Sequence, residues 1–150
     1  MNFESGSILR LFEENELNIS RLYRIYSEKI PQGKAFWIKL SKEEIQHALE
    51  IRESYKGKEN IFKENTFARG TIKHVSDFVF DSINQAKTEK LSYVEALEIA
   101  LRIEQSFLEK KCFEIFIPNQ ETVRNVLKKL NKETEKHIER LQIELKRIAK

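Results

Sequence analysis

Apolar residues recur every three or four positions along four long stretches of this chain, and few helix-breaking residues interrupt them. A side chain returns to the same face of an α-helix after 3.6 residues, so this spacing predicts amphipathic helices. The 150 residues include only 4 glycines and 2 prolines, which favours long helices over a sheet with many turns. The pattern therefore predicts one all-α domain spanning residues 1–150.

Capping and helix-breaking residues indicate where the four helices begin and end. The Pro31-Gln32-Gly33 link separates the first two, and so short a link makes them antiparallel neighbours. Ser92-x-x-Glu95 has the form of an N-terminal capping box. The expected helices run from about Ser5 to Ile30, Lys34 to Tyr55, Ser92 to Phe116, and Asn119 to Ala149.

The connection between the second and third expected helices, residues 62–90, is long and rich in apolar side chains. Such a content argues against disorder. We expect a shorter helix there, from about Thr71 to Lys87, packed against the other four.

Each of the four helical stretches carries polar residues within its otherwise apolar stripe. In the second stretch, Glu44 and His47 lie between Leu40 and Ile51 at helical spacing. A charge in such a stripe is costly unless something pairs with it, and a metal ion is a usual partner. Carboxylates neutralise divalent cations, and imidazoles add neutral nitrogen ligands. The residues that we expect to bind metal in the interior are Glu16, Glu44, His47, Glu104 and His137.

These motifs resemble the ferritin-like di-iron carboxylate family, specifically its rubrerythrin branch. The matching segments follow each other in order over nearly the whole chain. They are Glu16-Leu-Asn-Ile-Ser-Arg-Leu-Tyr23, Glu44-Ile-Gln-His47, Glu95-Ala-Leu-Glu-Ile-Ala-Leu-Arg-Ile-Glu104 and Glu135-Lys-His137-Ile-Glu-Arg-Leu141. The resemblance implies an antiparallel four-helix bundle with a long, partly helical crossover between helices two and three.

The resemblance also implies an activity. Two iron ions, or Mn or Zn in their place, would be bound in the bundle, and an oxidoreductase of this kind reduces peroxide or dioxygen. The electrons would come from a separate donor protein, because the single cysteine, Cys112, cannot build a four-cysteine rubredoxin site. Tyr23 would hydrogen-bond a ligand carboxylate. The oligomeric state stays open, although antiparallel bundle dimers are common in this family and a homodimer is one candidate.

The chain departs from the family pattern in the fourth helix. The family motif there is Glu-x-x-His, and this chain has Thr134 in the first position of the motif that ends at His137. The flanking Glu133 and Glu135 project about 100° to either side of that position. Loss of the carboxylate predicts either one weak or absent ion, or an open coordination position for water, peroxide or dioxygen.

Two alternative functions remain open. A lapsed ferritin-like bundle would bind one ion or none and have a structural or interaction role, and Thr134 is the residue in its favour. Iron oxidation for storage would require a closed cage of many subunits. His47 and His137, which lie in the apolar stripes, also have a purely structural interpretation, because a single buried His is more often a hydrogen-bonded core residue than a ligand. We take His74, on the crossover, as structural or exposed.

Charge and hydropathy patterning exclude further classes. The net charge of +3 is small and interleaved, without the Lys/Arg block of a nucleic-acid-binding surface. No apolar run approaches the length of a membrane span, and the N-terminus lacks the order of a signal peptide. We therefore expect a cytoplasmic protein with neither nucleic acid nor membrane as a partner.

Overall fold

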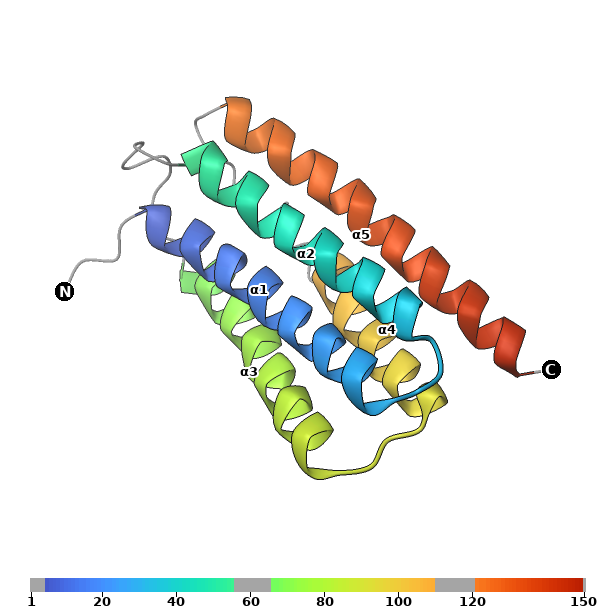
Figure 1. The fold of residues 1–150 in the computed structure, drawn as a ribbon. Helices are drawn as coiled ribbons and strands as arrows, with labels where there is room; N and C mark the ends of the chain where they lie inside the picture. Colours follow the sequence, from blue (N-terminus) through green and yellow to red (C-terminus); the bar gives the residue numbers. More distant parts are fainter. Residues whose placement is uncertain (1–4, 56–65, 110–120, 150) are drawn as a thin grey trace.

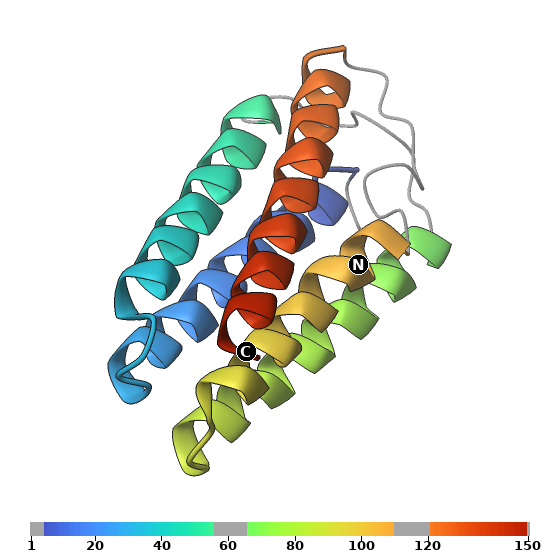
Figure 2. The same cartoon turned by 90° about the vertical axis from the view of Figure 1, so that its right-hand side faces the viewer.

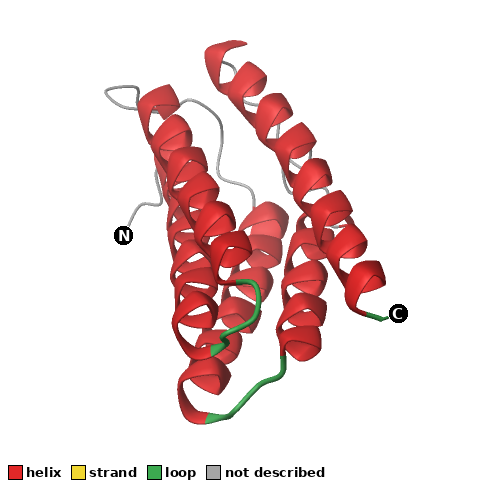
Figure 3. Ribbon diagram, turned by 45° about the vertical axis from the view of Figure 1, so that its right-hand side comes forward, coloured by secondary structure: helices red, strands yellow, loops and turns green. Residues whose placement is uncertain are grey.

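The computed structural model describes residues 5–55, 66–109 and 121–149, which form five α-helices (Figure 1). The helices are α1 (Ser5–Lys29), α2 (Lys34–Tyr55), α3 (Thr66–Thr88), α4 (Tyr93–Glu109) and α5 (Glu121–Ile148). No strand occurs within the described ranges (Figure 3). The all-helical prediction is therefore confirmed. Cys112, the expected extension to Phe116 and the expected cap at Asn119 lie outside the described residues.

The crossover helix α3 is longer than the sequence pattern predicted. It spans 23 residues and exceeds α4, which has 17. The expected helix started after Gly70, whereas α3 begins before it, because an isolated glycine is tolerated inside a helix. The apolar stripe of α3 is buried and consists of Ile72, Val75, Val79, Ile83 and Ala86. This crossover is thus one of five packed helices.

The five helices pack in a closed order around a common interior (Figure 2). The main packing pairs are α1 with α2, α2 with α5, α5 with α4, α4 with α3, and α3 with α1. Leu9, Leu22, Leu40, Ala100 and Leu141 are among the fully buried apolar residues inside this ring. Interior side chains from α1, α2, α4 and α5 therefore face a shared space.

A pair of serines sets the register of α1 against α2. The Ser20 hydroxyl donates to the carbonyl oxygen of Ser41 at 2.9 Å, and the Ser41 hydroxyl donates to that of Ser20 at 3.0 Å. Ser20 lies one turn after Glu16, and Ser41 lies one turn before Glu44. Because small side chains with reciprocal bonds hold the two backbones close, Glu16 and Glu44 are held at the same height.

The capping box predicted for α4 is present. The Ser92 backbone N–H donates to the Glu95 carboxylate at 2.9 Å, and the Glu95 N–H donates to the Ser92 hydroxyl at 3.0 Å. Both bonds satisfy amide groups that have no partner within the helix. The start of α4, and with it Tyr93, is therefore fixed in place.

The link between α1 and α2 requires glycine at position 33. Gly33 has φ of 71°, and a Cβ there would lie 2.4 Å from the ring of Tyr93. Gly33→Ala is therefore expected to lower the free energy of unfolding by more than about 1 kcal/mol. Urea denaturation measures the change. The matched control is Gly70→Ala, where a Cβ meets no described atom within 4 Å, and where we expect unchanged or slightly higher stability. Equal effects of the two substitutions would contradict the prediction.

Candidate metal centre

The structure brings the five expected metal ligands together in the interior. Glu16 comes from α1, Glu44 and His47 from α2, Glu104 from α4 and His137 from α5. None of the five is more than 4% exposed. They form two groups that could each hold a metal ion, with ligand atoms within 4.8 Å of one another in each group. Glu44 belongs to both groups, so the two candidate positions share a carboxylate.

The first group surrounds the Nδ1 atom of His47. This nitrogen lies 3.1 Å from Oε2 of Glu16 and 3.1 Å from Oε1 of Glu44. As a donor, it is shared between the two carboxylates. One imidazole nitrogen and two carboxylate oxygens from two helices thus converge on one point.

The second group surrounds the Nδ1 atom of His137. This nitrogen lies 3.2 Å from Oε2 of Glu44 and 3.5 Å from Oε2 of Glu104. It is buried and forms no hydrogen bond of good geometry with any described residue. The His47 and His137 rings stack with centroids 5.3 Å apart and planes inclined by 20°. Glu44 therefore presents one oxygen to each of two parallel imidazoles.

Tyr23 holds the carboxylate of Glu104, one of the glutamates that the sequence pattern placed in the interior. Its hydroxyl donates to Oε2 of Glu104 at 2.6 Å, and this bond joins α1 to α4 across the interior. Tyr23 is fully buried, so the bond has no competition from bulk water. The orientation of Glu104 is thus fixed by a neighbour outside the cluster.

Two glutamates that the sequence pattern did not indicate as contacts complete the surroundings. Glu43 accepts a hydrogen bond from Nε2 of His137 at 2.8 Å and another from Arg140 at 2.8 Å. On the other side, Oε1 of Glu133 lies 4.0 Å from Nε2 of His47. Glu43 directly precedes Glu44, Glu133 directly precedes Thr134, and each of the two glutamates reaches toward the histidine of the opposite helix. This shared placement was the signal available in the sequence.

Thr134 lies in the interior but brings no carboxylate to the cluster. It is 4% exposed, and its hydroxyl donates to the carbonyl oxygen of Leu130 on the same helix at 3.0 Å. Such a bond satisfies the hydroxyl within α5. Glu135, the other flanking glutamate, is exposed, and so is His74 on α3, in agreement with the expectation for that histidine.

Burial and mutual charge shift the pKa values of the carboxylates in opposite directions. Burial and the neighbouring Glu44 raise the pKa of Glu16 well above its usual range, and they raise that of Glu104 to about 7. Burial also acts to raise the pKa of Glu44, but the charge of His137 and hydrogen bonds hold it well below the usual value. Glu44 is therefore the carboxylate that stays ionised most readily.

Both histidines favour the charged form. Burial disfavours an imidazolium, yet hydrogen bonds to Glu16 and Glu44 raise the pKa of His47 to about 10. The charges of Glu104 and Glu44 likewise overcome burial and raise the pKa of His137. The hydrogen bond from His137 lowers the pKa of Glu43 to about 2. The interior of the bundle thus has a negative potential that two positive charges balance.

Comparison of the chain with models of protein families, with curated proteins and with solved structures found no match. Among the described helices, none combines the length and the apolar character needed to cross a membrane.

Proposed function

We propose that this protein is a ferritin-like di-metal carboxylate protein that reduces hydrogen peroxide or dioxygen at a centre inside the helical ring. The observation that best supports this proposal is that Glu44 is shared between two buried groups, each with one histidine and one further carboxylate. Glu16, Glu44 and His47 would hold one ion, and Glu44, Glu104 and His137 the other. Iron, when bound, supplies the electrons, one for each Fe(II) that is oxidised.

The donor set supports metal ions over a network made only for stability. A buried ion-pair network is often no more stabilising than apolar residues of the same volume. Here a buried imidazole nitrogen of His137 faces two carboxylates without a hydrogen bond among the described residues, as a ligand atom would. Its other nitrogen donates to Glu43, and metal-binding histidines usually donate in this way to a carboxylate.

The surrounding residues have separate tasks in this proposal. Glu43 orients the His137 ring so that Nδ1 faces the interior, and Tyr23 orients Glu104. Thr134 replaces a carboxylate by a shorter side chain and leaves a coordination position for the oxidant. In this proposal, the four ligand-bearing helices would be those of a ferritin-like bundle, and α3 would be its crossover. A separate donor protein would return electrons, and a second copy of the chain is a further candidate partner.

Anaerobic loading with Fe(II) tests this proposal. We expect up to two ions per chain by elemental analysis, and an absorption band of an oxidised, oxo-bridged product after peroxide is added. The matched control is Glu98→Gln on α4, because Glu98 is exposed and lies outside both groups. A protein that retains only trace iron after loading would overturn the proposal.

Thr134 favours a second candidate function, in which the protein binds a single ion or none and has a structural or interaction role. Thr134→Glu is the probe that separates the two. We expect the substitution to raise the affinity for the second ion at least tenfold, because a fourth carboxylate balances its charge. Without metal, the extra buried carboxyl group is expected to be protonated and to cost about 1–3 kcal/mol, as an unpaired neutral polar group does.

Thr134→Gln is the control for the size of the new side chain, and it is expected to leave the affinity for the second ion unchanged. Metal titration followed by calorimetry gives both affinities. If the unsubstituted protein already binds two ions with similar affinity, the single-ion function is excluded.

A further inference from the structure

Three aromatic side chains form a continuous series from the candidate metal centre to the outer part of the helical ring. Tyr23, which donates to Glu104, has its ring centroid 5.4 Å from that of Trp37. Trp37 in turn lies 6.1 Å from Tyr93, with the two planes nearly perpendicular. Tyr23 and Trp37 are fully buried, and Tyr93 is 7% exposed. Rings in contact exchange single electrons readily, so this series is a physical route for an electron.

Both ends of the series carry a proton acceptor. The Tyr23 hydroxyl donates to Glu104, and the Tyr93 hydroxyl donates to Oε2 of Glu144 at 2.5 Å. A phenol that loses an electron becomes acidic, and a carboxylate within hydrogen-bond reach takes its proton at once. Glu144 is bound by Arg147 on α5 through two bonds of 2.9 and 2.6 Å. A tyrosine whose hydroxyl donates to a carboxylate is therefore a favourable site for a neutral tyrosyl radical.

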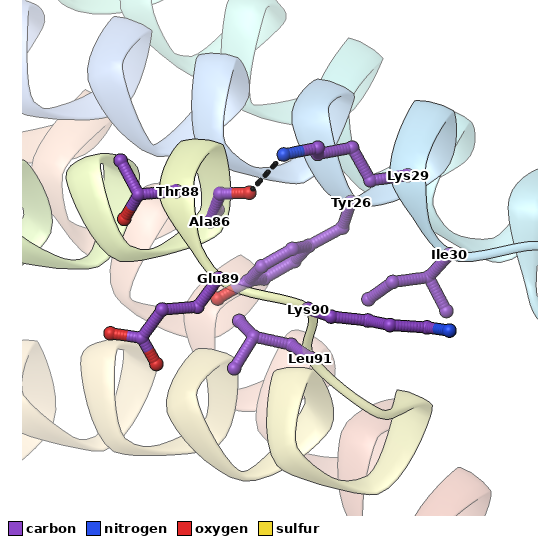
Figure 4. A pocket seen from close by; sticks show the side chains of 8 residues that line it. All are labelled: Tyr26, Lys29, Ile30, Ala86, Thr88, Glu89, Lys90 and Leu91. Carbon is purple, nitrogen blue, oxygen red and sulfur yellow. Dashed lines mark hydrogen bonds between the residues drawn. The ribbon is translucent and has the colours of Figure 1, made fainter.

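Tyr26 provides the internal contrast. Its ring is nearer to Trp37 than either paired tyrosine, with centroids 4.8 Å apart, but its buried hydroxyl has no hydrogen-bond partner among the described residues. Tyr26 lines a cavity of about 270 Å³ beside Lys29 and Leu91 (Figure 4). The Lys29 ammonium there donates to the carbonyl oxygen of Ala86 at 3.0 Å and not to Tyr26. Because no described protein group accepts its proton, Tyr26 is a less favourable site for a neutral radical than Tyr23 or Tyr93.

We propose that Tyr23, Trp37 and Tyr93 are a redox relay that carries one oxidising equivalent from the metal centre to Tyr93, between α4 and α5. The relay deepens the function proposed above and rests on it. The electron moves inward from Tyr93 to Trp37, then to Tyr23 and the centre, and the phenolic proton of Tyr93 passes to Glu144. The product is a neutral tyrosyl radical at position 93, which a reductant in solution or a donor protein can reduce.

The electron count explains why such a relay suits this chain. Reduction of one hydrogen peroxide to two waters consumes two electrons and two protons. Two bound Fe(II) ions would supply both electrons, whereas a centre that held a single Fe(II), because Thr134 stands in place of a carboxylate, would supply only one. The second electron then comes from Tyr93, both protons of the reaction come from solvent, and the Tyr93 proton stays on Glu144. The relay thus completes the reduction with a single ion.

Flash photolysis of the metal-free protein tests the relay without relying on iron. Trp37 is the only tryptophan in the chain, so a pulse at the red edge of the indole absorption ejects an electron from this residue. A cobalt(III) ammine complex in solution takes the electron irreversibly. Transient absorption then follows the tryptophanyl radical as it decays and a tyrosyl radical as it forms.

We expect the Trp37 radical to convert into a tyrosyl radical at the same rate in the natural protein and in Tyr26→Phe. Tyr23→Phe keeps the outward step, so conversion persists there. Tyr23→Phe combined with Tyr93→Phe is expected to lengthen the life of the Trp37 radical at least tenfold. In the Tyr23→Phe background, Glu144→Gln is expected to slow the conversion several-fold, whereas Glu98→Gln leaves it unchanged.

Two results would overturn the relay: conversion at the natural rate in the double variant, or its loss in Tyr26→Phe. Circular dichroism of each variant shows whether it is folded, and Glu144→Gln probes the outward step without removing a ring.

A second measurement separates the relay from the metal function. After peroxide is added to the Fe(II)-loaded protein, electron paramagnetic resonance of frozen samples is expected to show a tyrosyl radical that Tyr93→Phe abolishes. If iron does not bind, the metal function fails while photolysis still decides the relay. If iron is oxidised and the radical persists in Tyr93→Phe, the relay fails alone.

Discussion

Glu44→Gln is expected to abolish tight binding of both metal ions at once. Glu44 is the one carboxylate common to the two groups, and it presents separate oxygens to His47 and His137. Glutamine keeps the size of the side chain but loses its charge and one acceptor oxygen. The expected loss of affinity exceeds about 100-fold, the upper limit for removing an outer partner of a ligand. Metal titration followed by calorimetry measures it.

Two further substitutions provide a scale against which the loss of metal affinity in Glu44→Gln is compared. Glu43→Gln removes the charge that orients His137 from outside, so we expect a loss of about 10- to 100-fold, confined to one ion. Glu98→Gln changes an exposed carboxylate of α4 and is expected to leave both affinities unchanged. The order of effects should therefore be Glu44, then Glu43, then Glu98. If Glu44→Gln were no worse than Glu43→Gln, a shared ligand at position 44 would be excluded.

The helices and the members of the cluster could be predicted from the sequence because both depend on local periodicity. The stripe that contains Glu44 and His47 places them on one face whatever the tertiary structure is. The capping box at Ser92 and Glu95 is likewise a local signal, and the structure forms both of its hydrogen bonds. The polar residues at mid-helix in four of the stripes are buried together because those helices pack around one interior.

Contacts that depend on how far side chains reach across helices could not be predicted in this way. Glu43 lies about 100° around α2 from Glu44, where a helical pattern assigns it to solvent. It contacts His137 only because α5 packs against α2 at that height. The pairing of Tyr93 with Glu144 is similar, since the start of α4 and the end of α5 meet only in three dimensions. Thr134 was identified from the sequence, but its bond to Leu130 was not.

The stability of the protein is expected to depend on pH in opposite directions with and without metal. In the metal-free protein, the folded pKa of His47 is about 10, against 6.5 for an ordinary histidine. The stabilisation from a raised pKa is fully present below 6.5 and is lost as the pH rises to about 10. Glu104, with a folded pKa of about 7 against 4.5, loses stabilisation between those two values. Both groups make the metal-free protein less stable as the pH rises.

Below pH 4.5, the stability of the metal-free protein changes with pH in the opposite direction. Glu43, with its pKa lowered to about 2, stabilises the fold above 4.5, and this contribution is lost as the pH falls toward 2. The metal-free protein is therefore expected to be most stable near pH 4.5, where the contribution of Glu43 is complete and the loss at Glu104 begins. Between pH 6.5 and 10, it should lose on the order of 2–5 kcal/mol, since one pKa unit corresponds to about 1.4 kcal/mol.

A divalent ion inverts this dependence, because it binds neutral imidazole and ionised carboxylate. Binding therefore releases protons, and the apparent affinity rises with pH. With excess Mn(II), we expect the free energy of unfolding to rise from pH 5.5 to 8, and with a chelator to fall over the same range. Urea denaturation at pH 5.5, 7 and 8 measures both trends.

Two histidine variants test whether the buried Glu and His residues cause the opposite pH dependence of stability with and without metal. His47→Gln is expected to reduce the alkaline loss in the metal-free protein, with the remainder due to His137, and to weaken the rise with Mn(II). His74→Gln changes an exposed histidine on α3 and should preserve both trends. A fall in stability with pH that Mn(II) leaves unaltered would mean that the buried carboxylates and imidazoles pair only with one another. Because protons and metal ions compete for the same Nδ1 atoms, only a metal centre gives curves of opposite slope.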